Sequence, residues 1–269
     1  MTASTNSNQS LYDQAEEYRQ SRFVEKLTSE LKYHFCIKAL YRIPELAIAL
    51  IGESFPDLMV KLTSFFPHNM TITPISKDSP KWGAMIDLTD KLRLKAGIKK
   101  TITLCYSTTH KDKLGAFKDY IILNDIFLSY SIEEQEFLIM HELMHHKLTH
   151  LNIRLGIGFT FASLDLILLY YYPLAVILSE AAAFYVENTV SCYQEKEADL
   201  EAIKHLGTNK GAVTTFERAI EQICPISHLK NTTKFNQEVL RKIQLIAADF
   251  SAITHPSAVA RLKYSLSAI

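Results

Sequence analysis

Residues 155–178, with the sequence LGIGFTFASLDLILLYYYPLAVIL, place the strongest constraint on how this chain can fold. Asp165 is the only charged residue among them. A helix of about 20 apolar residues crosses the hydrocarbon core of a bilayer, so this stretch is long enough to span a membrane. Because water solvates apolar surface poorly, the stretch is expected to be buried within the protein or inserted into lipid.

The motif HELMH at 141–145, which contains candidate metal ligands, lies shortly before this stretch. A capping-box pattern at 131–134 predicts a helix that runs from there to about residue 150. Residues four apart lie on one helical face, so His141 and His145 can bind a single Zn²⁺. Glu142 is rotated away from the first histidine and can reach a water at the metal without being a ligand.

A catalytic zinc site needs a third protein ligand. The extended metzincin motif is absent, because leucine occupies both positions where it requires Gly and His. The carboxylates that follow the apolar stretch are Glu180, Glu187 and Glu195. Glu195 is favoured, since Asp199 lies one helical turn further on and can accept the remaining imidazole N–H of a ligand histidine.

These ligand positions limit the path of the apolar stretch. His145 precedes it and Glu195 follows it, yet both must reach one ion on one side of any membrane. Two full spans and a turn would use nearly all the residues between them. We therefore expect a helical hairpin inserted at about 155–190 and turning near Pro173, either in a membrane or packed within a soluble protein.

The remaining segments predict a mostly helical α+β protein. A polar tail at 1–10 is expected to be disordered, and apolar residues recur at helical spacing in an N-terminal region at 11–69. Short β-branched segments between 70 and 124 predict a small sheet. Residues 70–269 are expected to form the metal-binding domain that carries the hairpin.

Composition excludes several classes of protein. The chain has 29 Lys and Arg against 29 Asp and Glu, a balance that argues against a nucleic-acid partner. Its four cysteines are scattered, which argues against a disulfide framework or a thiolate zinc site. The N-terminus lacks the basic and apolar segments of an export signal, so the cytoplasm is the default compartment.

Three segments resemble the HtpX-type zinc metallopeptidases, a family that includes the CAAX prenyl proteases and the Oma-type proteases. They are HELMH at 141–145, EKEAD at 195–199, which matches the ExEAD box, and HPSAVAR at 255–261. The resemblance covers roughly residues 70–265. The chain departs from it at Gly115, where the family commonly has Asn, and at Met144, where it commonly has Gly.

The resemblance implies a gluzincin metallopeptidase domain that cleaves protein or peptide substrates with one zinc ion per chain. The metal ligands are expected to be His141, His145 and Glu195, with Asp199 behind them. The substrate is expected to lie, by β-augmentation, along an edge strand. The residues predicted for that strand are Tyr120, Ile121, Ile122, Leu123 and Asn124.

The same resemblance implies the catalytic roles. Glu142 is the expected general base, and His255 or Arg261 the expected stabiliser of the oxyanion. His146 and His150 are expected on the helix surface.

Two alternatives remain open on the sequence. The protein could be an inactive membrane adaptor that retains a structural zinc site. The peptidase is expected to be membrane-associated with its catalytic domain on the cytoplasmic side, and a soluble cytoplasmic peptidase with the hairpin as part of its core is the alternative.

Overall fold

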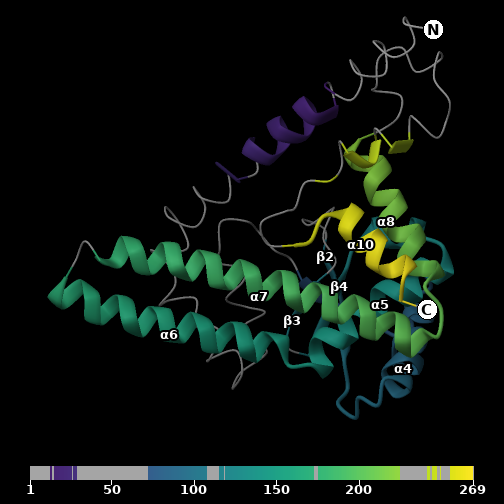
Figure 1. Ribbon diagram of the computed structural model, residues 1–269. Coiled ribbons are helices and arrows are strands. Elements are labelled where there is room, and N and C mark those ends of the chain that lie inside the picture. The colour runs from purple at the N-terminus through teal and green to yellow at the C-terminus, as the bar shows by residue number, and fades with distance from the viewer. Residues whose placement is uncertain are drawn as a thin grey trace, which may run out of the picture.

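The computed structural model describes residues 13, 15–25, 27–28, 72–107, 115–117, 119–172, 175–224, 241–242, 244–246, 249 and 255–268. In this part of the chain the protein is mostly helical with one small sheet, as the sequence predicted (Figure 1). Residues 15–25 are helical. The predicted disordered tail and most of the predicted N-terminal helical region lie outside the described residues.

The sheet is built from four short strands. They are β1 (Ile72–Pro74), β2 (Thr103–Ser107), β3 (Gly115–Phe117) and β4 (Tyr120–Leu123). Their order in the sheet is β1-β2-β4-β3, and β2 is parallel to β4 while the two outer pairs are antiparallel. Helix α4 (Gly83–Lys95) connects β1 to β2.

The predicted edge strand is wrong. Strand β4 pairs with β2 on one side and with β3 on the other, so its backbone groups are already hydrogen-bonded and cannot receive an extended peptide. Asn124 lies outside the strand and caps the 3₁₀ helix η2 (Asp125–Ser129), where its side chain accepts a hydrogen bond from Phe127 N–H at 3.0 Å. Among the described strands next to β4, the outer one is β3, whose three residues are too few for a clear sequence pattern.

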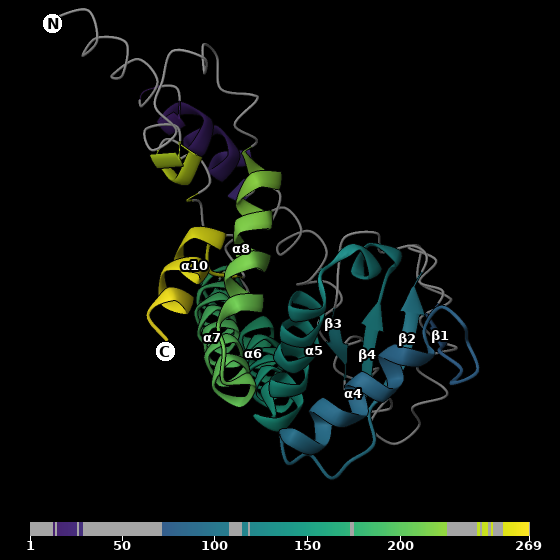
Figure 2. The same ribbon diagram turned by 90° about the vertical axis from the view of Figure 1, so that its right-hand side faces the viewer.

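Helix α5 (Ile132–Lys147) forms the centre of the domain. Ser131 and Glu134 make the predicted capping box, in which each side chain accepts a hydrogen bond from the other residue's backbone N–H. The helix lies between the sheet on one side and helices α7 (Ala175–Leu206) and α8 (Lys210–Ile223) on the other (Figure 2). It is therefore buried around most of its circumference.

Helix α8 packs on the first turns of α5 without a side chain between the two backbones. A methyl group built on Gly211 would meet the carbonyl oxygen of Glu133 at 2.1 Å, so this close approach requires glycine. Helix α10 (Ala258–Leu266) begins after Ser257, whose hydroxyl accepts the N–H of Ala260, and it packs on α8 and α7. This brings the C-terminal segment against both of these helices.

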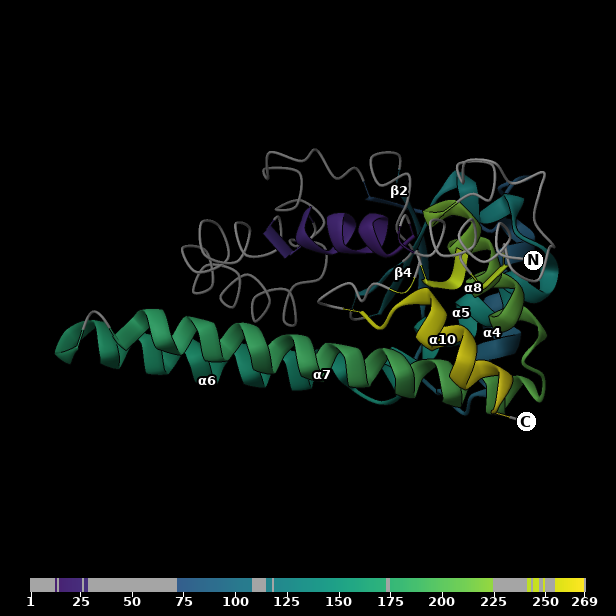
Figure 3. The ribbon, with the colours of Figure 1, turned by 45° about the horizontal axis from the view of Figure 1, so that its top comes forward.

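Helices α6 (His150–Tyr171) and α7 form the two arms of the predicted hairpin, and Pro173, near which the turn was predicted, lies outside the described residues. They run side by side and project away from the rest of the domain (Figures 1 and 3). In the described residues, His150–Leu168 is a segment long and apolar enough to cross a membrane, judged by length and composition, and only 6% of its most apolar stretch is buried. Large apolar side chains are exposed along the hairpin: Phe159, Leu166, Ile167, Tyr170, Ile177 and Leu178.

Candidate metal centre

Helix α5 presents the two histidines of the HELMH motif on one face. Their Nε2 atoms lie 3.0 Å apart, and both rings are largely buried. Two nitrogens that each lie about 2.0–2.1 Å from a tetrahedral zinc ion are separated by about 3.3 Å. The separation between His141 and His145 therefore suits one shared ion.

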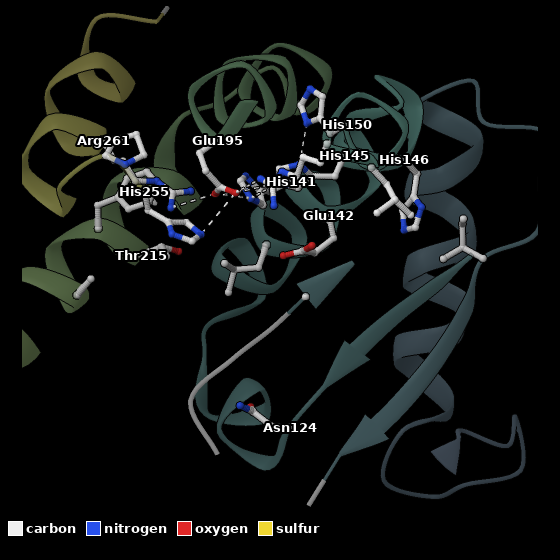
Figure 4. Close-up of a pocket in the computed structure, with 18 of the residues that line it drawn as sticks. Asn124, His141, Glu142, His145, His146, His150, Glu195, Thr215, His255 and Arg261 are labelled. Atoms are coloured by element: carbon white, nitrogen blue, oxygen red, sulfur yellow. Dashed lines mark hydrogen bonds and ion pairs between the residues drawn. The ribbon is translucent and has the colours of Figure 1, made fainter. Parts of the chain in front are cut away.

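Helix α7 brings Glu195 to the same point. One carboxylate oxygen lies 3.4 Å from His141 Nε2, and the other lies 3.4 Å from His145 Nε2 (Figure 4). These three side chains form a group, referred to below as the metal group, whose possible ligand atoms all lie within 4.8 Å of one another. Of the three candidate carboxylates, the fold thus selects Glu195; Glu180 and Glu187 do not belong to the group.

Asp199 holds the first histidine from behind. Its Oδ1 lies 2.8 Å from His141 Nδ1, which leaves Nε2 free to face the metal position. Arg261 donates to both oxygens of Asp199, at 2.8 and 2.7 Å, and the Tyr264 hydroxyl also hydrogen-bonds to Asp199. Burial raises the pKa of Asp199, but Arg261 and His141 outweigh burial and hold that pKa below its usual value.

Their surroundings shift the pKa values of the two histidines in opposite directions. Burial lowers the pKa of His141, but Asp199 and then Glu195 outweigh burial and raise that pKa to about 10. Burial lowers the pKa of His145, and the neighbouring His141 lowers it further. A cation that binds between the two rings must displace a proton there, as metal sites with histidine ligands generally do.

Glu142 lines a cavity of about 830 Å³ that opens beside this group. Its side chain lies on the same side of the helix as the cavity and toward the sheet (Figure 4). The cavity is bounded by β3 through Gly115, by Asn124 at the start of η2 and by α8 through Thr215. A volume of this size accommodates several residues of an extended peptide.

The C-terminal segment contributes two side chains to this cavity. His255 is half-exposed, and its Nε2 lies 3.6 Å from Glu195 Oε1. Arg261 is largely buried, and its Nη1 lies 3.6 Å from Glu195 Oε2 while its Nε and Nη2 donate to Asp199. His255 thus lines the cavity with a half-exposed ring, whereas the guanidinium of Arg261 is largely buried and engaged by two carboxylates.

The prediction that His150 lies on the helix surface is wrong. Its side chain is only 2% exposed, and its Nδ1 lies 2.7 Å from His145 Nδ1. In one continuous helix, a residue nine positions after His141 would point to the opposite face. The helix instead breaks at Thr149, which has a positive φ of 56°, and this break turns His150 back toward the metal group.

Taken together, two imidazoles and a carboxylate converge beside a glutamate in a peptide-sized cavity, which is the arrangement of a metal-dependent hydrolase. The sequence model of peptidase family M48 matches residues 95–268, and the chain belongs to this family. Membership makes the protein a peptidase of a metallopeptidase family and confirms the resemblance seen in the motifs. Comparisons with curated proteins and with solved structures found no match.

Proposed function

We propose that this protein is a zinc-dependent metalloendopeptidase that cleaves protein substrates at a membrane surface. The observation that carries the proposal is the convergence of His141, His145 and Glu195 beside Glu142 and a cavity. Family membership supports it, because the M48 family consists of zinc metallopeptidases. Two imidazole nitrogens and one carboxylate also match the ligand set of known catalytic zinc sites.

The three ligands would hold zinc and leave a coordination position facing the cavity. When bound there, zinc would polarise the scissile carbonyl and acidify the attacking water. Glu142 would take the proton from that water and pass it to the nitrogen of the leaving amine. One carboxylate would thus carry out both proton transfers.

His255 is the proposed stabiliser of the oxyanion. Its half-exposed ring lines the cavity beside Glu195, where it can donate a hydrogen bond to the oxygen that gains negative charge. Arg261 receives a different role, because its donors are bonded to Asp199. It positions Asp199, which in turn fixes the ring of His141.

The substrate backbone is proposed to pair with β3 rather than with β4. Strand β3 is the outer strand next to β4, and Gly115 at its start lines the cavity. An extended peptide added at this edge would pass the metal group with its backbone hydrogen bonds satisfied.

The hairpin is the proposed membrane anchor, with the catalytic domain on the cytoplasmic side. Its exposed apolar side chains occur on both helices and continue to the turn, where Tyr170, Tyr171 and Tyr172 are all exposed. Aromatic rings of this kind are frequent at membrane interfaces. Sedimentation with lipid vesicles in the absence of detergent tests this anchor. A protein that stays in the supernatant would contradict the anchor and favour a soluble peptidase.

Replacing Glu142 by Gln tests the peptidase proposal. The variant should retain about one zinc per chain, measured by mass spectrometry, while kcat on a general protein substrate falls about 10²- to 10⁴-fold. Glu136→Gln on the same helix is the matched control and should keep full activity. Equal activity of Glu142→Gln and the wild type would contradict the proposal and favour the inactive adaptor, which no observation supports at present.

A further inference from the structure

The second histidine of the metal group has a partner on its other nitrogen, as the first has Asp199. His145 Nδ1 lies 2.7 Å from His150 Nδ1, and His150 Nε2 lies 3.2 Å from Glu197 Oε2. Three side chains therefore form one continuous chain of contacts that leads away from the metal group (Figure 4 draws its histidines). Glu197 belongs to the EKEAD segment but is not part of the metal group.

The protons in this chain of contacts can be assigned only one way when a cation binds. His145 binds through Nε2, so its proton must be on Nδ1 and needs an acceptor. His150 Nδ1 is that acceptor, which places the proton of neutral His150 on Nε2. That N–H in turn needs an acceptor, and the Glu197 carboxylate supplies one.

The backbone at and immediately before His150 holds this residue in a defined position. The left-handed conformation of Thr149, uncommon for a β-branched residue, separates α5 from α6 immediately before His150. Gln194 on α7 donates a hydrogen bond to the His150 carbonyl oxygen. With the ring 2% exposed, water is poorly placed to substitute for Glu197 or His145.

We propose that His150 and Glu197 are positioning residues that orient His145 and strengthen its bond to zinc. The inference rests on the proposed function, because it assumes that His145 is a zinc ligand. The two histidines would then be held in different ways. His141 is held directly by the buried carboxylate of Asp199. His145 is instead held by His150, which in turn contacts the carboxylate of Glu197, a side chain with 37% exposure.

The test measures the zinc dissociation constant of the full chain by competition with a chromophoric chelator. His150→Phe fills the same space without an acceptor and should weaken zinc binding about 10- to 100-fold. His150→Gln should restore binding to within about threefold, because an amide can accept from His145 and donate to Glu197. Unchanged zinc affinity in His150→Phe would overturn the proposal.

Glu197→Ala provides a second variant whose side chain is less buried, in case His150→Phe does not fold. It should weaken zinc binding about three- to tenfold, at the low end of effects for outer-shell partners. Glu201→Ala, one turn further along α7, is the matched control and should bind zinc as the wild type does. Equal affinity of the Glu197 and Glu201 variants would count against the chain of contacts.

Nitrogen-15 NMR of histidines in the zinc-loaded wild type gives a readout that a merely structural role would not produce. Protons on His145 Nδ1 and His150 Nε2 are expected, and a proton on His150 Nδ1 would overturn the proposal. The two possible failures are distinguishable. A wild type that binds no zinc removes the proposed function, whereas a wild type that binds zinc with no effect of His150→Phe removes only the positioning role.

Discussion

The base and the tip of the α6–α7 hairpin are made of the same two helices but have opposite surroundings. At the base, His150, Glu195 and Asp199 are buried and each contacts a partner of complementary charge or hydrogen-bonding capacity. Toward the tip, large side chains such as Tyr170 and Leu178 are exposed. Specific polar pairs therefore hold the base, while the tip presents apolar surface.

This difference predicts two kinds of response to substitution. Removing one partner from a buried polar pair leaves the other uncompensated, which destabilises the folded protein strongly. Replacing an exposed apolar side chain leaves the folded protein almost unchanged but alters its affinity for lipid. Substitutions at the two ends of the hairpin can therefore separate stability from membrane binding.

Asp199→Ala at the base should have the largest effect. It leaves the largely buried Arg261 and the Nδ1 of His141 without their carboxylate. The free energy of unfolding should fall by about 3–5 kcal/mol, measured by urea denaturation, and the zinc content should fall with it. Asp87→Ala, at an exposed site, should stay within about 0.5 kcal/mol of the wild type. A loss below about 1 kcal/mol for Asp199→Ala would mean that the base is not held by this pair.

Glu134→Gln tests a polar pair in the domain body through pH. Burial raises the pKa of Glu134, but Arg218 and the capping hydrogen bonds outweigh burial and hold it below the ordinary value of 4.5. A lowered pKa stabilises the fold above the unfolded pKa, and this contribution is lost as pH falls through the folded pKa. The variant should unfold about 1.5–3 kcal/mol more easily at pH 7.

The difference between Glu134→Gln and the wild type should therefore shrink below pH 4.5 in urea denaturation series. Glu136→Gln serves as control on the same helix. A difference that is the same at pH 3 and pH 7 would show that the charge of Glu134 is not the cause.

Leu178→Ser at the tip should leave the free energy of unfolding within about 0.5 kcal/mol of the wild type. Its binding to lipid vesicles should weaken about 10- to 100-fold, because a leucine side chain buried in an apolar phase contributes about 1.5–3 kcal/mol. Leu94→Ser on α4, at a comparably exposed leucine, should not affect vesicle binding. Equal vesicle binding of all three proteins would mean that the tip does not enter the membrane.

Thr149→Asn at the junction of α5 and α6 should have the smallest effect. Asparagine adopts positive φ more readily than a β-branched residue, so the variant should be more stable by up to about 1 kcal/mol. Thermal unfolding measures this, with Thr160→Asn inside α6 as a control that should not be stabilised. A destabilised Thr149→Asn would indicate that the threonine side chain has a role beyond its backbone conformation.

Local patterns account for what the sequence predicted correctly. The capping box at Ser131 and Glu134 is a contact within one helical turn, and the structure contains it. The hairpin followed from the positions of two expected ligands on either side of an apolar stretch, which is a topological constraint. The mostly helical α+β class is also confirmed, and it was predicted from periodicity along the chain, which is again a local pattern.

Predictions that depended on distant contacts were less successful. The apolar sequence of β4 does not distinguish an edge strand from an internal one. Only its pairing with both β2 and β3 shows that it is internal. Arg261 was a candidate for the oxyanion, but its bonds to Asp199 engage its donors. His150 was expected at the surface because a single unexpected backbone angle at Thr149 changes the direction of the next side chain.

The sequence by itself determined the kinds of candidate metal-binding side chain, the helix that carries two of them and the need for a hairpin before the third. These features depend on residue chemistry and on spacing along the chain, which the sequence states directly. The tertiary structure alone decided which strand lies outside β4 and which partner each imidazole nitrogen meets. Those outcomes depend on contacts between segments far apart in sequence, whose geometry is set by packing of the whole domain.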